Sequence, residues 1–134
     1  MRIIFFGTPQ FAIPTLNALI ESSHEVIAVV TQPEKRRGRR EAVSPPPVKR
    51  TAIRADVSVF QPLRLRDADF IDLVRSLKPD LVVVAAYGKF LPDTLLAIPR
   101  LGMFNVHASL LPGYRGAAPI HRAVIAGETE TGVT

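Results

Sequence analysis

Three short runs of apolar residues constrain what this chain can fold into more than any other feature of its sequence. They occupy residues 3–6, 26–30 and 81–86, and none of them alternates between apolar and polar side chains. Such runs are typical of strands in a parallel sheet, which other elements cover on both faces. Apolar residues recur at helical spacing in the segments between them. The sequence therefore predicts an α/β fold with a Rossmann-like, twisted, mostly parallel sheet and helices on both faces.

Prolines, glycines and short polar residues mark the turns between these elements. Thr8 and Pro9 follow the first run and are expected to cap and begin a helix that extends to Glu21. Residues 129–134 look like the beginning of a further strand, so we expect the sequence to be incomplete at its carboxyl end. The other expected elements are helices at 48–55, from about Asp67 to Lys78, at 92–98 and at about 117–126, and strands at 57–60 and 103–107.

The turn after the first run argues against a dinucleotide site. The dinucleotide-binding fingerprint places three glycines between the first strand and its helix, and this turn contains only Gly7. The βαβ unit at residues 3–30 is therefore not expected to bind NAD.

Composition excludes several other classes of function. The 134 residues are 47% hydrophobic and 22% charged, as expected for one soluble globular domain. The absence of cysteine rules out disulfides, thiolate metal sites and cysteine nucleophiles, and is compatible with a reducing cytoplasm. The apolar run near the amino terminus is too short for a signal peptide or a membrane span, so we expect no membrane partner.

Residues 31–50 differ sharply from the rest of the chain. They show no apolar periodicity and contain four prolines and seven of the seventeen lysines and arginines. Five cations surround Gly38 between residues 35 and 40, a charge density that suits phosphate groups. A solvated surface loop and a contact with nucleic acid or polyphosphate are both compatible with this composition.

A second polar feature lies on the expected strand at 103–107. Asn105 and His107 are two residues apart and therefore point to the same side of a strand. A carboxamide can donate a hydrogen bond to a developing oxyanion, and an imidazole can exchange a proton near neutral pH. Such a pair is also often structural. The small residues Ala86 and Gly88, after the third run, can admit a flat ligand or allow tight helix packing.

Longer motifs link these features to a known family. The string Asn-Val-His-Ala-Ser-Leu-Leu-Pro at 105–112, followed by Arg-Gly at 115–116, resembles the signature of the folate-dependent formyltransferases. The resemblance covers essentially all 134 residues. Gly-Thr-Pro at 7–9 and Thr-Gln-Pro at 31–33 are similar to the methionyl-tRNA formyltransferases rather than to the enzymes acting on glycinamide ribonucleotide or aminoarabinose.

The resemblance implies transfer of a formyl group from 10-formyltetrahydrofolate to the amino group of initiator methionyl-tRNA, without a metal. It implies that Asn105 and His107 are catalytic. The folate-binding positions that it implies are Ala86, Tyr87, Gly88, Ser109, Leu110, Leu111 and Pro112, and the tRNA-binding positions are Arg36, Arg37, Arg39 and Arg40.

The basic segment departs from the family pattern. Arg36 and Arg37 replace a Pro-Ala pair, Arg40 replaces a glycine, and Glu41-Ala42 replace two lysines. The number of cations is roughly kept, but flexibility and the placement of charge are not. A third catalytic residue, an aspartate, and an OB-like tRNA-binding domain are expected beyond residue 134. Residues 1–134 then form the amino-terminal part of the catalytic domain of an enzyme expected to be cytoplasmic, or to lie in a bacterial-type organelle, and monomeric at full length.

Two alternatives stay open at this point. One is a related formyltransferase with a small acceptor, such as an amino sugar or a glycinamide nucleotide. The other is an inactive fragment that only binds folate or RNA. A sheet that lacks a strand also leaves an uncovered edge, so self-association of this chain is expected.

Overall fold

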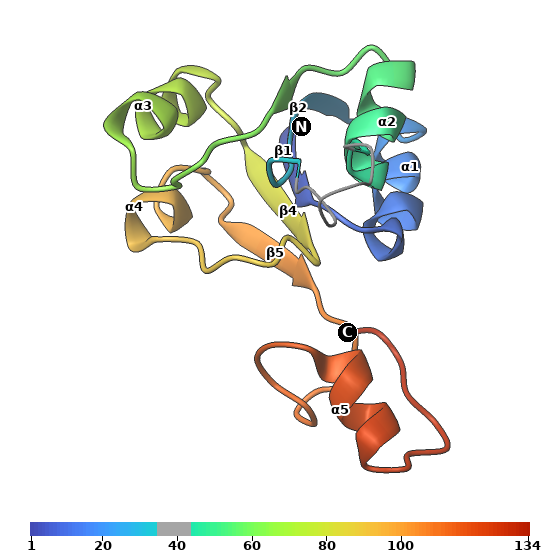
Figure 1. The fold of residues 1–134 in the computed structure, drawn as a ribbon. Coiled ribbons are helices and arrows are strands. Elements are labelled where there is room, and N and C mark those ends of the chain that lie inside the picture. Colours follow the sequence, from blue (N-terminus) through green and yellow to red (C-terminus); the bar gives the residue numbers. More distant parts are fainter. Residues whose placement is uncertain (35–43) are drawn as a thin grey trace.

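The computed structural model describes residues 1–34 and 44–134 and contains a parallel sheet in the strand order β3-β2-β1-β4-β5 (Figure 1). This arrangement confirms the predicted α/β class. Arg36, Arg37, Arg39 and Arg40 lie outside the described residues. The strands are β1 (Arg2–Gly7), β2 (Glu25–Val30), β3 (Val59–Phe60), β4 (Leu81–Ala85) and β5 (Met103–Val106).

The central strand β1 is paired on both sides. Ile3 is in register with Val26 of β2 and with Leu81 of β4. The four apolar residues from Ile3 to Phe6 are 0% exposed, which explains why the first run shows no alternation of polarity. The sheet is therefore built outward from β1 in both directions.

Helices cover both faces of the sheet. In Figure 1, α1 (Ile13–Ile20) and α2 (Pro47–Arg54) lie on one face, and α3 (Ala68–Ser76) and α4 (Asp93–Leu96) lie on the other. Successive residues of β1 face opposite sides of the sheet. Phe5 lies in the core cluster on the side of α1 and α2, and Phe6 lies in the cluster on the side of α3 and α4. The last helix, α5 (Pro119–Ile125), lies beyond the carboxyl end of β5 and away from the sheet (Figure 1). No described helix has the length and apolar character needed to cross a bilayer.

The predicted helix start at Thr8 and Pro9 is wrong. A short 3₁₀ turn (Gln10–Ala12) comes first, and α1 begins at Ile13. The backbone at Pro9 is extended, with ψ 177°, so the chain has not yet entered a helix there. The Thr8 hydroxyl does not cap a helix but donates to the carbonyl oxygen of Tyr87, 3.2 Å away in the loop after β4. The first turn is thus attached to a neighbouring loop.

Asp80 joins three segments at the amino-terminal edge of the sheet. Its carboxylate accepts hydrogen bonds from the backbone N–H of Arg2 at 2.8 Å and from the Arg100 guanidinium at 3.1 Å. These donors, the Arg2 N–H first, hold the pKa of Asp80 below its usual value. Its own N–H donates to the Arg2 carbonyl oxygen at 2.8 Å, which fixes the beginning of β4 against β1.

The close approach of backbone at Gly7 gives a first prediction. A Cβ atom added there would lie 2.7 Å from Cε1 of Phe5 and 2.9 Å from Cβ of Ala12, both fully buried. Gly7→Ala should therefore lower the free energy of unfolding by about 1–3 kcal/mol, the usual cost of overpacking. Urea denaturation measures this change. Asn17→Ala, on the exposed side of α1, is the control and should stay within about 0.5 kcal/mol; equal values for the two variants would contradict the packing argument.

Candidate active site

The loops that follow β4 and β5 leave the sheet side by side. Ala85 and Val106 are register partners in these parallel strands, so residues 86–88 and 107–109 emerge at the same edge. The chain fills the sheet from β1 toward β3 and then crosses to β4, so the strand order reverses between β1 and β4. Open parallel sheets bind ligands beyond the carboxyl ends of their strands, at such a reversal. The structure thus brings together the two predicted groups of residues that it describes.

His107 is held by a buried serine. Its Nδ1 atom lies 2.9 Å from the hydroxyl oxygen of Ser109, whose side chain is 0% exposed. The same hydroxyl donates to the carbonyl oxygen of Gly113 at 2.8 Å. Nε2 of His107 lies 3.4 Å from the carbonyl oxygen of Gly116. The loop at 109–116 therefore surrounds the imidazole with oxygen atoms.

The shorter of these contacts, between Nδ1 and the Ser109 hydroxyl, indicates which ring nitrogen carries the proton. Ser109 has one hydroxyl hydrogen, and the Gly113 carbonyl can only accept a hydrogen bond. The serine oxygen must then accept from His107, so Nδ1 carries a hydrogen in the neutral ring and Nε2 keeps its lone pair. When Nε2 takes up a proton, the new N–H faces the Gly116 carbonyl oxygen. His107 is thereby arranged to accept a proton at Nε2.

Thr134 closes the other side of this loop. Its backbone exchanges two hydrogen bonds with His107, at 2.8 and 2.9 Å, and its hydroxyl donates to the Ser109 carbonyl oxygen at 2.8 Å. The same hydroxyl accepts from the N–H of Leu111 at 3.1 Å. The expected strand at 129–134 is not formed, because pairing with the rest of the chain is limited to this residue.

Asn105 lies on β5, two residues before His107, and is exposed. Within the described part of the chain, its carboxamide has no hydrogen-bond partner and can therefore donate to a substrate. Leu110 and Leu111 are 59% and 42% exposed and present apolar surface in the loop that follows His107. Pro112, also exposed, continues this surface.

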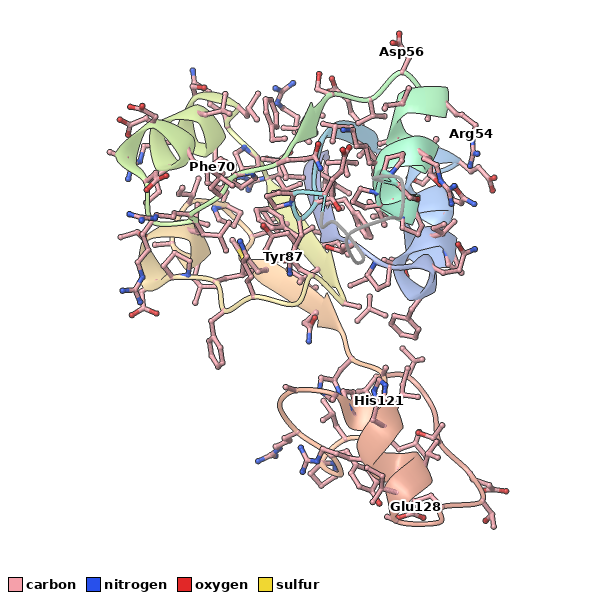
Figure 2. All side chains as sticks on the ribbon, viewed as in Figure 1. Arg54, Asp56, Phe70, Tyr87, His121 and Glu128 are labelled. Carbon is pink, nitrogen blue, oxygen red and sulfur yellow. The ribbon has the colours of Figure 1, made fainter. Side chains whose placement is uncertain are left out.

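In the loop at 86–88, Ala86 and Gly88 are exposed to solvent, whereas the side chain of Tyr87 is buried. Ala86 and Gly88 both adopt positive φ angles, 47° and 83°. Tyr87, labelled in Figure 2, is 2% exposed. Its ring packs edge-on against Phe6, with the centroids 5.2 Å apart. Burial raises the pKa of the Tyr87 phenol to about 12. The Tyr87 hydroxyl has no hydrogen-bond partner within the described residues.

An open recess of about 350 Å³ beside this loop was not predicted from the sequence. Phe90 is fully exposed there and Leu63 is 78% exposed, and the Lys89 ammonium donates to the Leu63 carbonyl oxygen at 3.0 Å. The signal in the sequence is the alternation of leucine and arginine at 63–66, together with an aromatic residue next to the small loop residues. Its lining consists of Leu63, Arg64, Leu65, Arg66, Lys89, Phe90 and Pro92.

A second recess lies away from this site. A larger recess of about 450 Å³, lined by Arg75, Lys78 and Arg100 among others, lies at the opposite edge of the sheet. Among residues 1–34 and 44–134, no cluster of three or more histidine, aspartate or glutamate side chains could hold a metal ion.

Comparison with known proteins gives matches over the whole chain. A family model described as formyl transferase matches residues 1–134. The methionyl-tRNA formyltransferase of Pelotomaculum thermopropionicum is 57% identical over 134 residues, which is 100% of this chain and 43% of that protein. The methionyl-tRNA formyltransferase of Staphylococcus epidermidis is 55% identical over 133 residues, 99% of this chain and 43% of that protein. The chain thus spans less than half the length of these relatives.

Solved structures show the same fold at lower identity. Glycinamide ribonucleotide transformylase 1 from Geobacillus kaustophilus superposes with a TM-score of 0.74 at 24% identity, over 99% of this chain and 71% of that one. A formyltetrahydrofolate deformylase from Pseudomonas syringae superposes with a TM-score of 0.71 at 21% identity, over 99% of this chain and 44% of that one. These matches extend the agreement to the arrangement of the strands and helices.

Removal of the Ser109 hydroxyl tests the proton assignment. In Ser109→Ala, the Gly113 carbonyl and the His107 Nδ1–H both lose their partner, so the neutral imidazole should become a mixture of two tautomers. The ¹⁵N chemical shifts of His107 report this directly. The control is Ser76→Ala, because that hydroxyl also donates to a carbonyl oxygen, that of Leu73, but at an exposed site on α3. A His107 that stays fully protonated at Nδ1 in Ser109→Ala would contradict the assignment.

The buried phenol of Tyr87 gives a prediction with a defined sign. Its pKa in the folded chain, about 12, exceeds the value of about 10 expected after unfolding. The unfolded chain therefore loses this proton first, and stability should fall as the pH rises from 10 to 12. Tyr87→Phe should reduce that fall and should be at least as stable as the parent near neutral pH, since no hydrogen bond among the described residues is lost.

Denaturation series at pH 8 and above measure this effect. Tyr114→Phe is the control, because the Tyr114 hydroxyl donates to Glu128 at 2.6 Å and its removal should lower stability near neutral pH. If Tyr87→Phe loses as much stability near neutral pH as Tyr114→Phe, the Tyr87 hydroxyl does make a hydrogen bond.

Proposed function

We propose, since the chain belongs to the formyl transferase family, that it supplies the folate site and two catalytic groups for transfer of a formyl group to an amine. The donor in this proposal is 10-formyltetrahydrofolate and the acceptor is the amino group of initiator methionyl-tRNA. The observation that carries the proposal is that His107, with Nε2 free to accept a proton, lies two residues after Asn105 at the carboxyl edge of the sheet, and that the Asn105 carboxamide has no partner among residues 1–34 and 44–134.

The chemistry needs both groups. The amine nitrogen forms a bond to the formyl carbon, and the carbonyl electron pair moves onto the formyl oxygen. The Asn105 carboxamide donates a hydrogen bond to this oxygen, while Nε2 of His107 takes the proton that the amine releases. The electron pair on the formyl oxygen then re-forms the carbonyl, the bond from carbon to N10 of the folate breaks, and N10 takes up the proton that His107 had accepted. Formylated amine and tetrahydrofolate are the products.

The folate would lie between the loop at 86–88 and the surface at 109–112. A flat pterin can approach the backbone at Ala86, which carries only a methyl group, and at Gly88, which has no side chain. Phe90 and Leu63 offer apolar contacts beside this loop, and Arg64, Arg66 and Lys89 can attract the carboxylates at the glutamate end of the molecule. Both chemical halves of a folate thus find matching groups at one edge.

The choice of methionyl-tRNA as acceptor is supported by two observations. The relatives with more than half of their aligned residues identical are named methionyl-tRNA formyltransferase. The basic segment, with Arg36, Arg37, Arg39 and Arg40, suits a polyanionic acceptor better than a small one. Since the chain spans 43% of those relatives, the tRNA contacts proposed here are a part of what such an enzyme would use.

Loss of the Asn105 carboxamide is the decisive substitution. Removal of one oxyanion donor typically lowers kcat by about 10²–10³, so Asn105→Ala should lose that much turnover. The fold should be unaffected, because the side chain is exposed and unpartnered among the described residues. Transfer of labelled formyl groups from 10-formyltetrahydrofolate measures the rate. Asn17→Ala on α1 is the control for the same chemical change and should retain the parent rate.

A panel of acceptors separates the proposal from its alternatives. Charged initiator tRNA, glycinamide ribonucleotide and an aminoarabinose nucleotide are offered separately with the same donor. Incorporation into tRNA supports the proposal, whereas incorporation into a small acceptor alone would overturn the choice of acceptor. Binding of folate or tRNA without any transfer would support the inactive fragment instead.

A further inference from the structure

Gln32 connects three loops at the carboxyl edge of the sheet. It lies two residues after β2 and is half-buried. Its side-chain amide donates to the Tyr87 carbonyl oxygen at 2.7 Å, the shortest contact that this carbonyl makes. Its backbone N–H donates to the Thr8 hydroxyl at 3.4 Å, and its carbonyl oxygen accepts from the Gln61 amide at 3.0 Å. The turns after β1, β3 and β4 are thereby bonded to one residue in the turn after β2.

The Tyr87 carbonyl is the anchor of the 86–88 loop. Among the described residues, the side chains of Thr8 and Gln32 donate hydrogen bonds to this carbonyl oxygen. The residues on either side have left-handed backbones, and such a conformation costs a non-glycine residue such as Ala86 about 1–2 kcal/mol. The two hydrogen bonds offset that cost and select this one shape of the loop.

The side chain of Gln32 also lies against Gly88. A Cβ atom on Gly88 would lie 2.8 Å from Nε2 of Gln32, so the glutamine amide occupies the space that a side chain would need. The amide thus lies directly behind the backbone of Gly88 while it holds the carbonyl of Tyr87. A change of shape at Gln32 would therefore be passed directly to both residues.

From these contacts we propose that Gln32 is a positioning residue for the folate, which sets the shape of the 86–88 loop without touching the reacting atoms. The inference rests on the proposed function, because it takes the loop to be part of the folate site. It adds that affinity for the folate depends on a side chain from the turn after β2, and that the chemistry at Asn105 and His107 does not. Substitution of Gln32 should therefore weaken binding of the formyl donor.

The test compares Gln32→Leu with Gln61→Leu. Gln32→Leu removes the donor to Tyr87 at similar size, and one such bond corresponds to about a 3- to 10-fold weaker affinity. Gln61→Leu removes an amide that bonds Gln32 itself but leaves the bond to Tyr87 in place, and should weaken affinity less. Calorimetric titration with 5-formyltetrahydrofolate, which is stable during the measurement, gives the dissociation constants.

A readout without ligand separates positioning from general stability. In Gln32→Leu the backbone amide resonances of Tyr87 and Gly88 should move, whereas in Leu19→Ala, a destabilising change on α1, they should not, and folate affinity should be kept. If the parent chain binds 5-formyltetrahydrofolate and Gln32→Leu binds it equally well, the inference is overturned while the proposed function stands. If the parent does not bind the folate, the proposed folate site fails, and the inference fails with it.

Discussion

Pairing of β1 with β2 on one side and with β4 on the other is the constraint on which the remaining structure depends. It buries β1 from Ile3 to Gly7 and leaves the turn after it between the loops that follow its two neighbours. Thr8 can therefore bond the Tyr87 carbonyl, and Gln32 can reach the same atom from the other side. The site is a consequence of strand order, because residues far apart in sequence are brought to one edge only by this arrangement.

The two halves of the candidate site are built by one principle. In each half, a side chain donates to a backbone carbonyl: Ser109 to Gly113 within one loop, and Gln32 to Tyr87 across two loops. A carbonyl only accepts hydrogen bonds, so its presence fixes the direction of every bond around it. At His107 this direction determines the position of a proton, and at residues 86–88 it determines the shape of a loop. Hydrogen bonds of this kind fix the local geometry of a loop although they bury little apolar surface.

Much of this architecture could be predicted from the sequence, because burial on both faces imposes a continuous apolar run and helices impose a period. The runs at 3–6 and 26–30 lie in strands, and the run at 81–86 lies in β4 apart from its last residue. The exact beginning of α1 was missed, since Thr8 has the residue type of a cap but finds a partner 79 positions away. For the same reason, the buried position of Tyr87 and the role of Gln32 leave no local signal. The His107 and Asn105 pair was found through its motif, whereas the proton assignment needed the distances to Ser109 and Gly113.

The register of β1 against β4 also sets an order of events during synthesis. Ile3 pairs with Val26 after only a short helical connection, but its partner on the other side is Leu81. Closing so long a loop is entropically costly, and contacts of this range slow folding. On the ribosome, the first strand must wait with one edge unpaired until the third apolar run has been made and has left the exit tunnel. The earliest residues of the chain are thus among the last to reach their final surroundings.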